Sequence, residues 1–380
     1  MPPIITCVNG NYEPKRPEQF VCNESIALIV SKTGNLEVFG QDQKCNQVVA
    51  NVPKFSLRGH SVNLLDNFLV ISSSIHSSGA WWYHSLRAAR GGLLANPWEH
   101  TNTTGDNAPI GHISFVHGNN LVLLGGERNT KVMIETGREV FGKWKTKSLS
   151  LTWLGSWDHF DPSIKDTCVV KVAMDSFFVL GGRSTSNNQI QSTVIKINMA
   201  DETVEEVGSL LYPRTQHACA IISSPSTINE MLILVTGGYS DSSTARDEVF
   251  DPMTSHSREM GSSLNIPRLN HQMVNIGGKV FALGGQRQPD DNSRLDKIEV
   301  FDANSETWDF HTTSLLTETT DSLALTELPR SAVFCSQSCQ CGVTSRTRIA
   351  GGGEAEVMAL LKVFNNYILN NRSRIIPGWV

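Results

Sequence analysis

Pairs of glycines recur along the chain at nearly constant spacing, and this repeat constrains the fold more than any other feature. The intervals between successive pairs are 56, 56 and 47 residues. Each pair follows a short apolar run, as at residues 177–180. A period of this length is typical of a repeat protein in which each unit is one supersecondary structure. The pairs are Gly125-Gly126, Gly181-Gly182, Gly237-Gly238 and Gly284-Gly285.

A second mark precedes the glycines in each unit. His217 lies 20 residues before its pair, because residues 223–230 form an insertion between two strands. One residue type at one place in each unit is best explained by repeated packing. We therefore interpret the marks as structural residues and expect no metal site. Four of them stand thirteen residues before the pair, or before Ser73 where serine replaces glycine: His60, His112, Cys168 and His271.

A polar loop and a third apolar run follow each glycine pair, as at residues 193–197 and 297–301. Aspartates such as Asp251 and Asp302 then start a turn, and a run that includes Trp308 completes the last unit. Each unit therefore contains four short strands, spaced about ten to twelve residues apart, which is the pattern of a β-propeller blade.

The order of arginine, histidine, strand, glycine pair, strand with aspartate and tryptophan resembles the kelch repeat, over roughly residues 20–334. The clearest matches begin at Pro213-Arg214 and Pro267-Arg268. The resemblance implies an all-β, kelch-type propeller. Residues 328–334 repeat the Pro-Arg opening, whereas residues 26–55 supply three strands without an opening strand. We expect residues 329–334 to add the innermost strand of the first blade, which closes the ring at six four-stranded blades.

The two ends of the chain are expected to lie outside the propeller domain, at residues 1–22 and 335–380. The first end, with Cys7 and Cys22, resembles the last part of a sushi-type module, the alternative being a short disulfide-tied leader. The second end, with Arg348-Ile349-Ala350-Gly351-Gly352, resembles the activation segment of trypsin-like serine proteases. That resemblance implies cleavage between Arg348 and Ile349, and the alternative is a disordered tail.

The cysteines and the N-terminus bear on the compartment. Cys168 and Cys219 lie in apolar strand-like runs, so we expect them to pack as small hydrophobic side chains. The other six cysteines favour an oxidising compartment, whereas the N-terminus has no signal-peptide pattern. A secreted protein that is incomplete at its N-terminus would explain both observations. We expect an extracellular glycoprotein with three sequons, the alternative being a cytoplasmic protein with free thiols. The six cysteines could form three disulfides in 15 pairings: Cys7, Cys22, Cys45, Cys335, Cys339 and Cys341.

Several function classes lack support in the sequence. The net charge is −5, which argues against a nucleic-acid surface, and no apolar window is long enough for a membrane span. The catalytic His, Asp and Ser segments of trypsin-like proteases do not occur, nor do phosphate-binding or zinc-protease motifs. Copper-radical oxidases also use kelch-like propellers, but the five tyrosines form no convincing ligand set with cysteine and histidine. We expect no enzyme activity and no cofactor.

The loops after the glycine pairs are the predicted binding site, because propeller loops at one face are held by rigid sheets. Arginine and tyrosine contribute most to binding energy at interfaces. We predict a non-catalytic module that binds a protein, an acidic peptide or an acidic glycan, the alternative for these side chains being solvated loop charges. A second hypothesis is the recognition arm of a protease zymogen whose catalytic domain is missing. The predicted site residues are Arg128, Asn129, Arg183, Tyr239 and Arg287.

Overall fold

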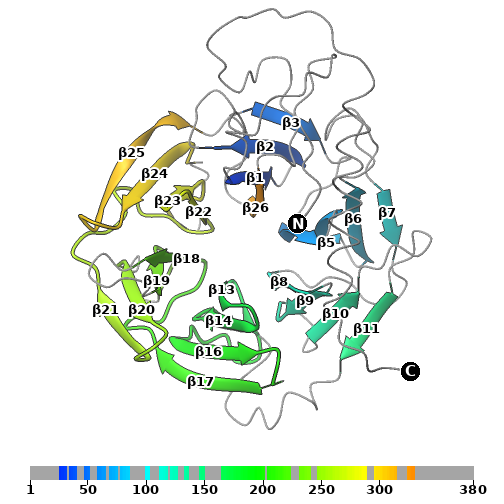
Figure 1. Ribbon diagram of the computed structural model, residues 1–380, viewed down its shortest axis with the longest axis horizontal. Coiled ribbons are helices and arrows are strands. Elements are labelled where there is room, and N and C mark those ends of the chain that lie inside the picture. Colours follow the sequence, from blue (N-terminus) through cyan, green and yellow to red (C-terminus); the bar gives the residue numbers. More distant parts are fainter. Residues whose placement is uncertain are drawn as a thin grey trace, which may run out of the picture. The chain divides into compact units, whose positions relative to one another are not determined.

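Four-stranded antiparallel sheets arranged as a propeller make up the fold of this computed structural model (Figure 1). Apart from these sheets, β12 (Ile164–Lys165) and β15 (Arg183–Ser184) form a two-stranded ladder. The structure describes residues 25–31, 34–40, 47–51, 58–65, 68–75, 78–85, 99–102, 111–118, 120–126, 132–136, 145–149, 164–201, 203–223, 231–240, 246–288, 295–314 and 323–329.

The sheets are numbered I to VI in chain order. Sheet I contains β1 (Ser25–Ser31), β2 (Asn35–Phe39), β3 (Gln47–Asn51) and β26 (Leu323–Pro329). Sheet II contains β4 (Arg58–Leu65), β5 (Phe68–Ile75), β6 (Ser78–Ser85) and β7 (Glu99–Asn102). Sheet III contains β8 (Ile113–His117), β9 (Asn120–Leu124), β10 (Val132–Thr136) and β11 (Lys145–Leu149).

The remaining three sheets follow the same order of strands. Sheet IV contains β13 (Cys168–Ala173), β14 (Ser176–Leu180), β16 (Thr193–Asn198) and β17 (Thr203–Ser209). Sheet V contains β18 (Ala218–Ser223), β19 (Met231–Thr236), β20 (Glu248–Asp251) and β21 (His256–Glu259). Sheet VI contains β22 (Gln272–Ile276), β23 (Lys279–Leu283), β24 (Lys297–Asp302) and β25 (Thr307–Ser314).

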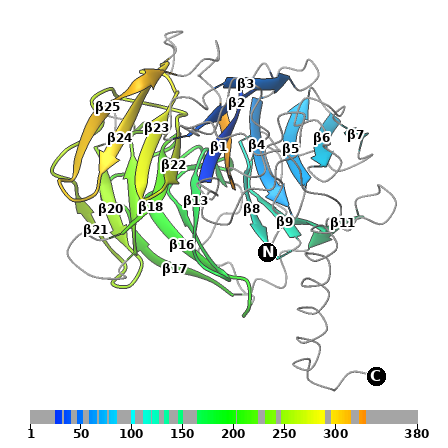
Figure 2. The same ribbon diagram turned by 45° about the horizontal axis from the view of Figure 1, so that its top comes forward.

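The innermost strand of each sheet lies beside the innermost strands of its two neighbours. In this order β26, β4, β8, β13, β18 and β22 each lie beside the next, and β22 lies beside β26 again. Residues of these strands line one cavity, which we call the central channel. Figure 1 shows the sheets arranged around this centre. Strand β4, which has no label in Figure 1, is seen beside β5 in Figure 2. The first and last described strands of the chain therefore meet within sheet I.

The hydrophobic core lies in the seams between neighbouring sheets. In the seam between sheets V and VI, Leu234 and Val249 belong to the same buried cluster as Phe301 and Trp308. Other clusters fill the seams between sheets IV and V, III and IV, and VI and I. The second strand of a sheet is buried almost throughout, as in β14 and β19, whereas the outermost strands β17 and β21 are largely exposed. This explains the continuous apolar runs before the glycine pairs.

The glycine pairs stand where one sheet meets the opening segment of the next. The amide of Gly238 donates to the carbonyl of Arg268 at 2.9 Å, and Gly182 donates to Arg214 at 2.7 Å. At Gly237 φ is +57°, and an added Cβ would lie 2.5 Å from the carbonyl oxygen of Arg268. It would also lie 2.9 Å from Cε1 of His271. Glycine is required here both by the left-handed backbone and by the close approach of the next sheet.

The closing strand occurs, but the predicted position was wrong. The sequence pattern placed it at residues 329–334, whereas β26 runs from Leu323 to Pro329 and pairs with β1 along its whole length. Leu323, Ala324 and Leu328 are buried, so the apolar residues before the Pro-Arg pair make the strand. Pro329 ends β26 instead of opening it, and residues 330–334 lie outside the described residues.

Two expectations about cysteines were also wrong. Cys168 and Cys219 form a disulfide, with their Cα atoms 6.0 Å apart, and do not pack as separate hydrophobic side chains. Cys168 also does not occupy the position of the histidine mark, because a register shift in the β13–β14 hairpin adds one residue. Thr167 takes that position, and its hydroxyl donates to the carbonyl of Leu180 at 2.6 Å. Counting residues to the glycine pair could not detect the bulge.

Several predictions fall on residues that the structure does not describe. These are the two chain ends at residues 1–22 and 335–380, which include the cleavage site Arg348–Ile349, and the six remaining cysteines. The described part of the chain contains no helix that could cross a membrane.

The glycine contact predicts unequal costs for two alanine substitutions. Gly237→Ala should lower the free energy of unfolding by about 3 kcal/mol, because strain and a carbonyl clash add together. Gly278→Ala should cost about 1 kcal/mol, since φ is +83° there but nothing lies within 4 Å of the added carbon. Urea unfolding of the two variants would measure the difference, and equal losses would contradict the seam contact.

Candidate functional site

The loops after the glycine pairs lie next to the opening segments of their own sheets. Tyr239 and Thr215 exchange backbone hydrogen bonds at 2.8 and 3.0 Å, and Gln286 and Leu269 do so at 3.0 and 2.8 Å. In sheet IV, Arg183 pairs with Lys165 in the β15–β12 ladder. We call this end of the innermost strands the loop face. It is defined by Lys165, Arg183, Thr215, Tyr239, Leu269 and Gln286.

A chain of backbone hydrogen bonds runs around the channel mouth at this face. Asn270 N donates to Gln216 O at 2.9 Å, Gln216 N donates to Asp166 O at 2.8 Å, and Asp166 N donates to Gly111 O at 3.2 Å. The backbone angle φ is positive at all four residues: 53° at Asn270, 58° at Gln216, 53° at Asp166 and 74° at Gly111. The left-handed backbone turns each opening segment into its strand and links sheets III, IV, V and VI.

Two fully buried arginines fix the opening segments of sheets V and VI. Arg214 Nη2 lies 2.6 Å from Glu248 Oε1, and Nη1 donates to the carbonyl of Gly237 at 3.0 Å. Arg268 pairs with Glu299 at 3.0 Å and donates to the carbonyl of Gly284 at 2.7 Å. Each arginine therefore ties its opening segment to the third strand and to the first glycine of the same sheet.

These arginines are part of the framework and not of a ligand site. Burial raises the pKa of Glu248 and lowers that of Arg214, yet the hydrogen-bonded ion pair holds both charges inside the sheet. The sequence marked both positions as the start of a repeat, but not as ion pairs. The available signal was a glutamate in the third strand of each sheet, Glu248 and Glu299, since a carboxylate in a buried strand requires a cation nearby.

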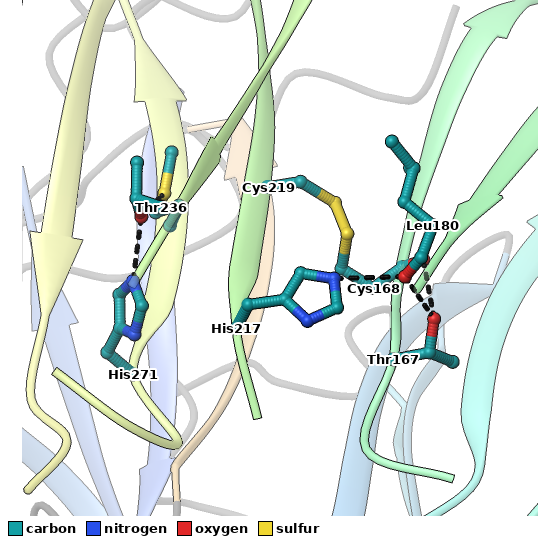
Figure 3. The surroundings of a disulfide bond; sticks show 8 residues. Thr167, Cys168, Leu180, His217, Cys219, Thr236 and His271 are labelled. Atoms are coloured by element: carbon teal, nitrogen blue, oxygen red, sulfur yellow. Dashed lines mark hydrogen bonds between the residues drawn. A yellow bond between two sulfur atoms is a disulfide. The ribbon is translucent and has the colours of Figure 1, made fainter. Parts of the chain in front are cut away.

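The histidine marks join each opening segment to the preceding sheet (Figure 3). His217 Nε2 donates to the carbonyl of Leu180 at 2.9 Å, and His60 Nε2 donates to that of Val30 at 2.9 Å. His271 Nε2 lies 2.8 Å from the hydroxyl of Thr236. The structural interpretation of the histidines agrees with these contacts between sheets.

Burial keeps these histidines neutral. It lowers the pKa of His217 to about 3, with a further contribution from the charge of Arg214, and it lowers the pKa of His60 to about 4. A carbonyl can only accept, so Nε2 of both rings carries the proton and Nδ1 has none. Nδ1 of both rings is buried and has no hydrogen-bond partner within the part of the chain that the structure describes.

The structure places three of the five predicted site residues at the loop face, in three successive sheets. Arg183 follows the glycines of sheet IV and is half-buried, and its Nη1 donates to the carbonyl and side-chain oxygens of Asn188 at 3.2 and 3.3 Å. Tyr239 follows the glycines of sheet V and is half-buried, and Arg287 of sheet VI is exposed. Arg128 and Asn129 lie outside the described residues.

Sequence reasoning missed one exposed apolar residue between sheets IV and V. The connection from β17 to β18 carries Leu211, with 48 % of its surface exposed, directly before Tyr212 and Pro213. The amide of Leu211 donates to Glu248 Oε2 at 2.6 Å, so the same carboxylate that holds Arg214 also fixes this connection. The Tyr-Pro-Arg sequence was a signal for an ordered connection, but not for an exposed leucine.

The channel below the loop face is a cavity of about 680 Å³ lined by residues of all six innermost strands. Polar side chains that line this cavity form hydrogen bonds with neighbouring residues. Asn63 Nδ2 donates to Ser114 Oγ at 2.7 Å, and Asn275 Nδ2 donates to the carbonyl of Ile221 at 2.9 Å. Among the residues that the structure describes, no three His, Cys, Asp or Glu side chains are grouped as metal ligands.

Comparison with known proteins gives one family match. Residues 267–310 match the Kelch motif, which covers the opening segment and all four strands of sheet VI down to Phe310. No curated protein matches the chain. The Kelch motif and the propeller arrangement therefore agree with the sequence interpretation for this unit.

The neutral histidines predict a loss of stability in acid. Below pH 6.5 the unfolded chain binds protons that His60 and His217 cannot bind when folded, so the free energy of unfolding falls as the pH falls. Each histidine should contribute about 1.4 kcal/mol per pH unit between its folded and unfolded pKa values. His217→Gln, which can still donate to Leu180 O, should flatten the dependence between pH 4 and 6 in urea titrations. An unchanged slope would show that His217 is protonated in the fold.

Proposed function

We propose that this protein is a non-catalytic binding protein that presents its loop face to an acidic segment of a protein ligand. One observation carries the proposal: Arg183, Tyr239 and Arg287 occupy equivalent loops of three successive sheets, at the same end of the channel. Side chains of these types provide much of the binding energy at protein interfaces. The Kelch motif supports it, because a Kelch propeller generally serves as a scaffold for protein binding.

The ligand is proposed to be acidic because two of these three side chains are guanidinium groups. Arginine binds carboxylates through two parallel hydrogen bonds, and Arg287 is exposed at the loop face. Leu211 adds an exposed apolar side chain on the connection between sheets IV and V, which suits a peptide better than a highly charged glycan.

Two further features belong to the proposal. We infer that the six four-stranded sheets form one ring of six blades, closed by the pairing of β26 with β1. We also infer an extracellular location, since the Cys168–Cys219 disulfide is more stable in an oxidising compartment.

Charge reversal at the loop face provides the test. Arg183→Glu with Arg287→Glu should weaken binding of a polyglutamate peptide about tenfold or more at low salt, because two favourable contacts become repulsive. Lys279→Glu is the control for each single replacement, since it makes the same charge change as Arg183→Glu or Arg287→Glu alone, at the exposed start of β23. Surface plasmon resonance with immobilised peptide would measure the affinities.

The pattern of losses decides between the possible sites. An equal loss in each single variant and in the control would contradict the loop face and indicate a general charge effect. A loss of heparin binding without any loss of peptide binding would assign the face to a glycan instead.

A further inference from the structure

The Cys168–Cys219 disulfide lies in the wall of the central channel. It joins the innermost strands β13 and β18 of neighbouring sheets, at a sequence separation of 51 (Figure 3). Both cysteines line the cavity of about 680 Å³. Cavities of roughly 300–1,000 Å³ admit small-molecule ligands, so the channel has room for a small thiol beside this bond.

The two cysteines differ in exposure. Along β18 the burial alternates: Ala218, Ala220 and Ile222 are buried in the seams, whereas Cys219 and Ile221 are half-buried. Since successive side chains of a strand point to opposite sides, Cys219 points toward sheet IV, where it meets Cys168. Cys168 opens β13 and keeps only 9 % of its surface exposed. Both side chains line the channel and Cys219 is the more exposed of the two, so we expect a molecule in the channel to reach Cys219 first.

The seam between sheets IV and V is held by contacts that do not involve sulfur. Gly182 N donates to Arg214 O at 2.7 Å, Gln216 N donates to Asp166 O at 2.8 Å, and His217 Nε2 donates to Leu180 O at 2.9 Å. A buried cluster that includes Phe178, Ile233 and Phe250 fills the same seam. Cleavage of the disulfide leaves these contacts in place, so thiol exchange does not require unfolding.

We propose that this disulfide is a thiol-exchange site, at which a low-molecular-weight thiol from the channel attacks Cys219 Sγ. The thiolate forms a bond to Cys219 Sγ, the disulfide bond breaks, and Cys168 leaves as a thiolate that takes a proton from water. The product is a mixed disulfide on Cys219 and a free thiol on Cys168. A second thiol molecule releases Cys219 as a thiolate and forms the oxidised thiol dimer, which balances the two electrons. This site is independent of the ligand proposed for the loop face.

The full chain can be tested with reduced glutathione in native buffer. The glutathione adduct should form on Cys219 and not on Cys168, while circular dichroism shows the fold intact. Peptide-resolved mass spectrometry after acid quenching distinguishes these two cysteines from the other six. Absence of an adduct or of reduction at either cysteine until denaturant is added would overturn the proposal and make the bond a purely structural crosslink.

Two single-cysteine variants provide a matched comparison. Cys168→Ser leaves Cys219 as a free thiol at the channel, whereas Cys219→Ser leaves Cys168 as a buried thiol. Iodoacetamide should modify Cys219 in the first variant at least about tenfold faster than Cys168 in the second, because reactivity follows access. Equal rates, or faster modification of Cys168, would refute the assigned point of attack. Equal melting temperatures of the variants would show that a difference in rate does not arise from unfolding.

Discussion

One backbone contact underlies each seam that the structure describes from sheet III to sheet VI: the amide of a second glycine donates to a carbonyl that opens the next sheet. The distances are 2.7 Å from Gly126 to Ile164, 2.7 Å from Gly182 to Arg214, and 2.9 Å from Gly238 to Arg268. Such a bond brings two backbones so close that no side chain fits between them. The buried arginines and histidines then hold the opening segment at the place where its carbonyl can accept.

This framework separates the residues that build the propeller from those that are free to recognise a ligand. Arg214 and Arg268 have the same chemistry as Arg287, yet the first two are fully buried ion-pair partners and the third is exposed. Residue type alone therefore does not identify a binding residue in a repeat protein. The position relative to the glycine pair identifies a binding residue better. Side chains before the pair are buried in the sheet, and those after the pair lie at the loop face.

The sequence was informative about the repeat and less so about register. Glycine pairs, apolar runs and turn aspartates report the local structure of each unit, so the four-stranded pattern could be predicted from them. The hairpin bulge near Ala173, the position of β26 and the Cys168–Cys219 bond depend on which residues meet across strands or sheets. The spacing of residues along the chain does not show which of them are in contact across strands or sheets. For the same reason the sequence predicted the site as a set of loops. It did not predict the hydrogen bond that Arg183 donates to the carbonyl of Asn188.

The pairing of β26 with β1 also governs the order of assembly during synthesis. Ser25 pairs with Pro329 and Ser31 pairs with Leu323, so the partner of the first described strand is the last described strand to be synthesised. Until then one edge of β1, although apolar and buried in the mature fold, has no partner within its own sheet. A nascent chain with such an edge is open to pairing with other chains. The edge of β1 therefore stays uncovered within its own sheet until residues 323–329 have been synthesised.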